Sequence, residues 1–166
     1  MSPVFEQHSF ELISRSAEQT RRVGMRLGAM LHPGDLVGLV GDLGAGKTTM
    51  MQGIASGWGS LDPVSSPTFV LVNVYRHSGE QRFYHLDAYR LRGAADVIDL
   101  DLETMLDEGP VVVEWADRIE DALPDERIWV QMTWLDETRR QLLFSALGEG
   151  CQKMLRRFRN QIFGVA

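Results

Sequence analysis

The chain has 166 residues with 44% hydrophobic and 24% charged side chains, which predicts one soluble domain without a membrane span. The net charge is −6, and the tail from Cys151 to Ala166 contributes +4, so the other 150 residues carry −10. Such an acidic body disfavours direct binding of nucleic acid, because affinity for polyanions comes largely from Lys and Arg.

The first 13 residues include Glu6 and Glu11 and lack the basic start and apolar core of a secretory signal. The single cysteine excludes an internal disulfide, and both features predict a cytoplasmic protein. Ser16 then begins a capping box, Ser16-Ala17-Glu18-Gln19, and a helix ends at Pro33 and Gly34. Its apolar residues at helical spacing are Val23, Leu27 and Leu31.

Residues 36–40 form an apolar run typical of a strand buried on both faces of a parallel sheet. The sequence GDLGAGKT follows at 41–48, a complete G-x-x-x-x-G-K-[ST] phosphate-binding loop, here called the phosphate loop, and 48–56 are predicted as a helix. Backbone N–H groups of such a loop converge beside the positive end of the helix dipole, which suits a polyphosphate. Lys47 would reach the β and γ phosphates, and the Thr48 hydroxyl would bind Mg²⁺. The predicted nucleotide-binding residues here are Gly41, Asp42, Leu43, Gly44, Ala45, Gly46, Lys47, Thr48 and Thr49.

The next elements are a loop over 57–66, two strands and a short acidic region. The strands at 69–76 and 82–86 are rich in β-branched or aromatic residues and are joined by a connector with glycine, which predicts an antiparallel pair. Residues 96–108 mix six acids with apolar residues and predict one or two short amphipathic helices, ended by Gly109 and Pro110.

A second apolar run, at 111–113, brings Glu114 and Trp115 to the end of a strand. In phosphate-loop ATPases the strand beside the loop strand carries a carboxylate that holds Mg²⁺, so Glu114 is the predicted metal ligand; an ordinary surface carboxylate is the alternative. Trp115 belongs either to the core or to the site. Residues 127–134 and 139–146 predict a last hairpin.

In the tail, Leu155, Phe158 and Ile162 lie on one helical stripe surrounded by basic residues. We expect a phosphate-loop ATPase domain at 1–148, and a basic amphipathic helix at 149–166 that packs on the domain or on a partner. The predicted fold is α/β: a phosphate-loop NTPase-like sheet with a mostly parallel core, antiparallel hairpins and helices on both faces.

Four motifs occur in order along the chain. They are GDLGAGKTT at 41–49, Ser66-Pro67-Thr68-Phe69 followed by Leu71-Val72-Asn73, HLDAYRL at 85–91, and Glu114-Trp115. With these motifs the chain resembles the TsaE (YjeE) ATPases over about residues 16 to 124. The basic tail matches none of the family motifs.

The resemblance implies a role in making threonylcarbamoyladenosine, the modification beside the anticodon of tRNAs that read codons starting with A. In that family, TsaD bound to TsaB transfers the threonylcarbamoyl group, and TsaE binds the pair and hydrolyses ATP to permit repeated turnover. The implied cofactors are ATP and Mg²⁺. We expect contact with tRNA only through the complex, and a monomer or weak oligomer with weak ATPase activity when the chain is alone.

The resemblance also assigns roles to residues. Lys47 and Glu114 would act in catalysis with Asp87, which could orient the attacking water, act as a base or pair with Arg90. Ser66, Pro67 and Thr68 would form the switch that senses the γ phosphate; a plain turn is the alternative. Ser16, and less clearly Thr20, would approach the nucleoside. Whether Arg139 or Arg140 reaches the nucleotide is left open.

Two other functions use the same loop. A small-molecule kinase needs a lid and an acceptor pocket, and the chain is short and lacks an Arg-rich insertion. An adaptor that binds ATP as a signal without significant hydrolysis would share every residue named above. A GTPase is disfavoured, because no Asn-Lys-x-Asp segment occurs and no Asp-x-x-Gly follows the loop.

Overall fold

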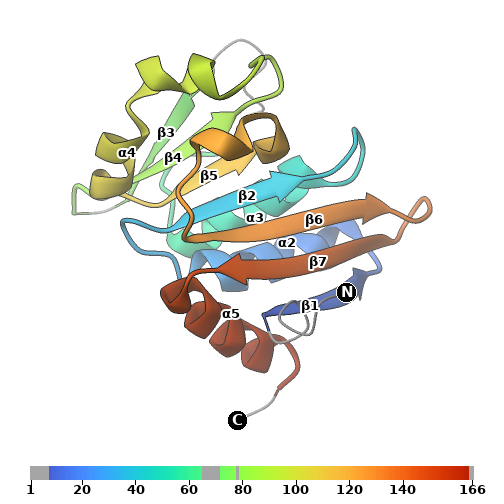
Figure 1. Cartoon of the computed structure of the whole chain (residues 1–166). Coiled ribbons are helices and arrows are strands. Elements are labelled where there is room, and N and C mark those ends of the chain that lie inside the picture. Colours follow the sequence, from blue (N-terminus) through green and yellow to red (C-terminus); the bar gives the residue numbers. More distant parts are fainter. Residues whose placement is uncertain (1–7, 65–71, 78, 165–166) are drawn as a thin grey trace.

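The structure is a computed structural model that describes residues 8–64, 72–77 and 79–164. Its sheet has seven strands in the order β1-β7-β6-β2-β5-β4-β3 (Figure 1). The strands are β1 (Ser9–Ser14), β2 (Leu36–Val40), β3 (Val72–Arg76), β4 (Arg82–Asp87), β5 (Val111–Glu114), β6 (Arg127–Trp134) and β7 (Arg140–Leu147). The helices are α2 (Ala17–Gly28), α3 (Lys47–Trp58), the 3₁₀ helix η1 (Ala94–Leu100), α4 (Leu102–Glu108), the 3₁₀ helix η2 (Ala116–Ala122) and α5 (Glu149–Ile162).

The centre of the sheet is parallel and its edges are antiparallel. Strand β2 pairs in parallel with β5 and β6, and β4 pairs in parallel with β5. The antiparallel pairs are β1 with β7, β6 with β7, and β3 with β4. The predicted parallel core and both predicted hairpins are therefore confirmed.

Helices cover both faces of the sheet, as the sequence predicted. One hydrophobic cluster joins the sheet to α2, α3 and α5, and a second cluster on the other face joins it to η1 and η2. In Figure 1, α2 and α3 lie behind the sheet. All five residues of β2 are buried, because this central strand is covered on both faces.

Four glycines set the position of the helix that follows the phosphate loop. Gly24 and Gly28 of α2 face Gly53 and Gly57 of α3. A Cβ on Gly28 would lie 1.9 Å from the carbonyl oxygen of Ile54, so the two backbones are closer than any larger residue would allow. This contact ties α3, which begins at the phosphate loop, to the middle and end of α2.

Helix α5 packs on the sheet of its own chain. Its residues Leu155 and Phe158 are buried, and the Phe158 ring centroid lies 5.1 Å from that of Phe144 in β7. Ile162 packs against the same cluster. The apolar stripe of the tail is thus occupied by the domain, and the basic residues Lys153, Arg156, Arg157 and Arg159 are exposed.

Two elements were not expected from the sequence. In strand β1, at the sheet edge, the polar Ser14 is buried and the apolar Ile13 is exposed, so the sequence does not show a clean alternation. The 3₁₀ helix η2 is too short and too polar to show helical periodicity. The acidic region does form two short helices, and residues 69–71 of the predicted third strand lie outside the described part. No helix among the described residues is long and apolar enough to cross a membrane.

Candidate nucleotide and metal site

The phosphate loop joins the end of β2 to the start of α3. Gly41, Gly44 and Gly46 have φ values of 153°, 82° and 101°, a region that favours glycine. Gly46 is the N-cap of α3 and its carbonyl accepts from Met50 N at 2.9 Å. The loop therefore has the strand, turn and helix context that aims backbone N–H groups at a bound phosphate.

Lys47 folds back over the loop. Its Nζ donates to the carbonyl oxygens of Gly41 at 2.5 Å and Asp42 at 2.9 Å, and lies 4.0 Å from the ring centroid of Trp115. The residue is only 6% exposed. Burial lowers the pKa of Lys47, and the charges of Glu114, Asp42, Asp117 and Asp87 oppose this shift. The ammonium group is thus held beside a group of carboxylates at the loop.

The sheet register brings two predicted catalytic carboxylates together. Glu114 at the end of β5 is paired with Leu39 of β2 on one side and with Asp87 of β4 on the other. Because all three strands are parallel, their C-terminal ends meet at the edge where the phosphate loop begins. Glu114 is 4% exposed, so it is a buried carboxylate at the end of a strand and not a surface residue.

Glu114 is held by a buried histidine. His85 Nε2 lies 2.5 Å from Glu114 Oε2, and His85 Nδ1 lies 3.0 Å from the hydroxyl oxygen of Tyr75. His85 is completely buried and Tyr75 is 3% exposed. This chain of contacts restrains the Glu114 carboxylate from the β4 side of β5, the side opposite β2.

Asp87 is half-buried at the end of β4. Its Oδ1 accepts from Tyr89 N at 2.9 Å. Burial raises the pKa of Asp87, the hydrogen bond from Tyr89 lowers it, and the charge of Glu114 raises it further. A carboxylate with these neighbours is suited to hold or accept a proton close to the Lys47 ammonium.

Trp115 stands between the loop and the helix that follows β5. Its φ is 58°, and its ring centroid lies 4.9 Å from that of Tyr89. The Arg118 guanidinium lies 5.0 Å from the Tyr89 ring and 5.5 Å from the Trp115 ring. Trp115 therefore borders the phosphate loop and Lys47 and also packs against one of the two hydrophobic clusters.

Two hollows adjoin the phosphate loop. The larger, about 670 Å³, lies between the loop, Trp115 and β6. The smaller, about 240 Å³, lies between the start of α2, the start of α3 and the turn between β6 and β7. Its lining residues are Arg15, Ser16, Ala17, Thr20, Gly46, Thr49, Glu137, Thr138 and Arg140.

The smaller hollow brings together Ser16 and Thr20 with Arg140, which lies far from them in the sequence. The Ser16 hydroxyl caps α2 by accepting from Gln19 N at 3.0 Å, and Ser16 also lines the hollow with Thr20. Arg140 Nε donates to the Gly44 carbonyl at 3.1 Å, whereas Arg139 Nε donates to Asp136 Oδ2 at 2.6 Å. Of the two arginines, Arg140 is therefore the one that contacts the phosphate loop.

The donor set fits Mg²⁺ bound together with a nucleotide. The described residues contain no cluster of three His, Cys, Asp or Glu side chains able to hold a metal by themselves. Mg²⁺ typically takes one or two carboxylates with substrate phosphates and water, and Glu114 and the exposed Thr48 of the first turn of α3 supply oxygen atoms at this edge. The open space around Gly44, where an added Cβ would meet nothing within 4 Å, leaves the loop free for a phosphate chain.

Some functional residues could not be recognised from the sequence, and some predicted ones lie outside the described part. Asp117 lines the larger hollow with the phosphate loop, and its only sequence signal is its position three residues after Glu114. The part played by His85 and Tyr75 depends on strand pairing and was not anticipated. The predicted switch residues Ser66, Pro67 and Thr68 lie outside the described residues.

Comparisons with known proteins agree on one family. The family model described as "Threonylcarbamoyl adenosine biosynthesis protein TsaE" matches residues 14–142. A Bacillus subtilis relative named tRNA threonylcarbamoyladenosine biosynthesis protein TsaE is 38% identical over 131 residues, 79% of this chain and 82% of that protein. A Streptomyces coelicolor relative of the same name is 44% identical over 110 residues, 65% of this chain and 74% of that protein.

A solved structure shares the fold. The crystal structure of YdiB from Bacillus subtilis superposes with a TM-score of 0.77 at 29% identity and covers 93% of this chain and 96% of that one. This likeness supports the α/β fold of the phosphate-loop type. The chain belongs to the TsaE family of threonylcarbamoyl adenosine biosynthesis proteins.

Proposed function

We propose that this protein is the Mg²⁺-dependent, ATP-hydrolysing component of the machinery that makes threonylcarbamoyladenosine next to the anticodon of tRNA. One observation carries the proposal: the pairing of Glu114 with Leu39 puts a buried carboxylate at the strand end beside the phosphate loop. Burying a carboxylate and an ammonium group costs free energy. In a turn that binds no ligand, nothing would offset that cost.

In the proposed reaction, the loop N–H groups and Lys47 hold the β and γ phosphates and offset their negative charge. Thr48 and Glu114 hold Mg²⁺, which when bound neutralises charge on the phosphates. Asp87 orients the attacking water and can take its proton. To reach the phosphates, the Lys47 ammonium would exchange its hydrogen bonds to the Gly41 and Asp42 carbonyls for bonds to phosphate oxygens.

The nucleoside would occupy the smaller hollow beside Ser16, with Arg140 bracing the phosphate loop from the side. The larger hollow, next to Trp115 and Asp117, would admit the attacking water or a partner group. Phosphoryl-transfer enzymes that lack one stabilising group hydrolyse slowly until a partner supplies it. An arginine finger supplied by a partner, for example, raises the rate by roughly 10³ to 10⁵. We propose that the TsaB–TsaD pair plays that part, that tRNA is reached only through it, and that the protein works in the cytoplasm.

The test is nucleotide binding by the purified chain. The intrinsic fluorescence should report micromolar or tighter binding of ATP in preference to GTP, strengthened by Mg²⁺ and abolished by Lys47→Ala. Release of inorganic phosphate from ATP should follow, slowly. Equal affinity for ATP and GTP would contradict the proposed preference for ATP. Transfer of phosphate to a small acceptor would contradict the proposal and favour a kinase.

A further inference from the structure

A separate hollow of about 470 Å³ lies away from the phosphate loop, between η1, the start of α4 and the end of η2. It is lined mainly by small or apolar side chains: Ala94, Ala95, Val97, Ile98, Leu102 and Ala122. Ile98 is 79% exposed, whereas Val97 is buried beneath it. The hollow therefore combines an apolar wall with one strongly exposed apolar side chain.

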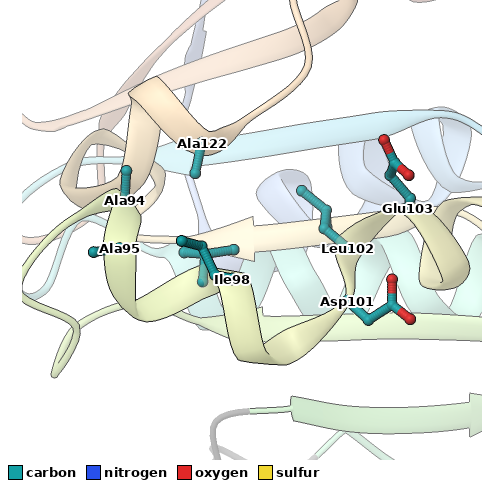
Figure 2. Close-up of a pocket in the computed structure, with 8 residues that line it drawn as sticks. Ala94, Ala95, Ile98, Asp101, Leu102, Glu103 and Ala122 are labelled. Carbon is teal, nitrogen blue, oxygen red and sulfur yellow. The ribbon is translucent and has the colours of Figure 1, made fainter.

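The hollow has one apolar end and one acidic end. Figure 2 shows Ala94 and Ala95 at one end and the carboxylates of Asp101 and Glu103 at the other. Further exposed carboxylates occur on the same two helices, namely Asp96, Asp99 and Asp107. Residues 93–108 contain no Lys or Arg.

These acidic charges are not neutralised within the part of the chain that the structure describes. The ion pairs found there include Arg82 with Glu108 and Arg127 with Glu120, but none involves the carboxylates of Asp96, Asp99, Asp101, Glu103 or Asp107. Asp101 accepts hydrogen bonds from Thr104, and Asp96 accepts from Arg92 N. The local field is therefore negative, and a cationic group would be favoured at this end of the hollow.

The walls of the hollow are connected to the nucleotide site. Helix η1 follows β4 and the site residue Asp87, and η2 follows β5 and the site residue Glu114. Tyr89, in the segment after β4, has its ring in contact with that of Trp115 at the start of η2, and Arg118 of η2 lies over both rings. The hollow is thus built from segments that directly follow the two strands carrying Asp87 and Glu114.

We propose that this hollow is the docking site for a segment of a partner protein that inserts one apolar side chain beside Ile98 and places a Lys or Arg against Asp101 and Glu103. The apolar end supplies the buried anchor, and the acidic end selects basic segments and rejects nucleic acid. This inference rests on the proposed function, in which the TsaB–TsaD pair is the partner that accelerates the ATPase.

The experiment measures the affinity of the full chain for purified TsaB–TsaD by biolayer interferometry, with ADP and Mg²⁺ present. Ile98→Lys removes the anchor, Glu103→Lys reverses the charge, and Ala95→Trp fills the hollow. Each should weaken binding about tenfold or more, as for central interface residues. Each should leave basal ATP hydrolysis and Tm unchanged, since none of the three residues lies at the nucleotide site.

The matched controls lie at the other end of the sheet. Leu147→Lys changes an exposed leucine of β7, which is 47% exposed, and Glu149→Lys reverses an exposed charge on α5. Both should bind TsaB–TsaD as the wild type does. The affinity of the wild type should also fall with added salt more steeply than that of Glu103→Lys.

The outcomes separate this inference from the proposed function. If the wild type fails to bind TsaB–TsaD, the proposed function is wrong. If the wild type binds and the three hollow variants bind as well as it does, the docking site is wrong. The docking site is also wrong if the two control variants lose as much affinity as the hollow variants. If the hollow variants instead lose only concentration-dependent self-association, the occupant is a second copy of this chain and the proposal is overturned.

Discussion

The imidazole of His85 lies behind the carboxylate of Glu114, with Nε2 and Oε2 2.5 Å apart and both side chains buried. On its other side, His85 Nδ1 meets the Tyr75 hydroxyl at 3.0 Å. Nε2–H can therefore donate to Glu114 while Nδ1 accepts from Tyr75. A carboxylate held from behind in this way presents its remaining lone pairs in a fixed direction, as outer-shell partners do for metal ligands.

His85→Leu should weaken metal binding without weakening nucleotide binding itself. Loss of an outer-shell partner typically costs about 10- to 100-fold in metal affinity. The measurement is Mn²⁺ affinity in the presence of ADP, compared with ADP affinity in EDTA. His85→Gln keeps an N–H donor and should recover much of the loss, and Tyr75→Phe should cost less than His85→Leu. Equal metal affinity in His85→Leu and the wild type would contradict this role.

Glu114→Ala should lower the rate of ATP hydrolysis by about 10- to 100-fold or more. Loss of a residue that only supports a metal ligand already costs about 10- to 100-fold, and Glu114 is proposed as a ligand itself. The loss should shrink as Mg²⁺ concentration rises, because a weakened metal site fills at higher metal. Steady-state phosphate release across a Mg²⁺ titration checks this. Hydrolysis at the wild-type rate would show that Glu114 is not a metal ligand.

Arg140→Ala should reduce nucleotide affinity equally with and without Mg²⁺, because Arg140 contacts the Gly44 carbonyl and lines the hollow beside Ser16. We expect about a tenfold loss, as for one charge-assisted hydrogen bond. Arg139→Ala is the control, since Arg139 pairs with Asp136 instead. Isothermal titration with ADP measures both variants, and a larger loss in Arg139→Ala would reverse the assignment.

Gly53→Ala should destabilise the protein by about 1–3 kcal/mol through overpacking, despite the better helix propensity of alanine. A Cβ at this position would lie 2.1 Å from the carbonyl oxygen of Arg21, so α2 and α3 must separate. Gly150→Ala on α5 is the matched control, because its Cβ would meet nothing within 4 Å. It should be neutral or stabilising by up to about 1 kcal/mol. Urea unfolding of both variants gives the comparison, and equal stabilities would refute the tight α2–α3 contact.

Asp136 holds the turn between β6 and β7, and its pKa lies at about 2, below the ordinary 3.8. The hydrogen bond from the Arg139 side chain is the largest cause, followed by those from the N–H groups of Thr138 and Arg139. Because the folded pKa is lowered, the stabilisation is complete above pH 3.8 and is lost as pH falls through about 2. NMR titration of the carboxyl carbon should give this value, and Arg139→Ala should raise it. An ordinary pKa in the wild type would contradict the turn geometry.

The phosphate loop and its flanks could be predicted because their signals are local. An apolar strand, a glycine-rich loop and a helix follow one another, and the observed β2 and α3 agree with that pattern. The second apolar run indicated Glu114, the resemblance added Asp87, and the parallel register places the two side by side. Their chemical roles stay predictions.

Contacts that depend on register or on close helix approach could not be predicted in the same way. Tyr75 reaches His85 diagonally across the β3–β4 pair, and a shift of one residue would remove that contact. The glycines of α2 and α3 recur at a spacing of four, a visible signal, but which helices they bring together is a tertiary fact. Asp117 lines the hollow beside the loop and follows Trp115, whose φ of 58° is a backbone conformation that no local sequence pattern indicates.

We propose that ATP hydrolysis at this phosphate loop permits repeated turnover of the TsaB–TsaD pair. The most direct measurement is the amount of threonylcarbamoyladenosine formed per TsaB–TsaD pair on excess tRNA, with the wild-type chain or Lys47→Ala. We predict many products per pair with the wild type, accompanied by stimulated ATP hydrolysis, and about one with Lys47→Ala. Repeated turnover with Lys47→Ala, or none with the wild type, would contradict the account.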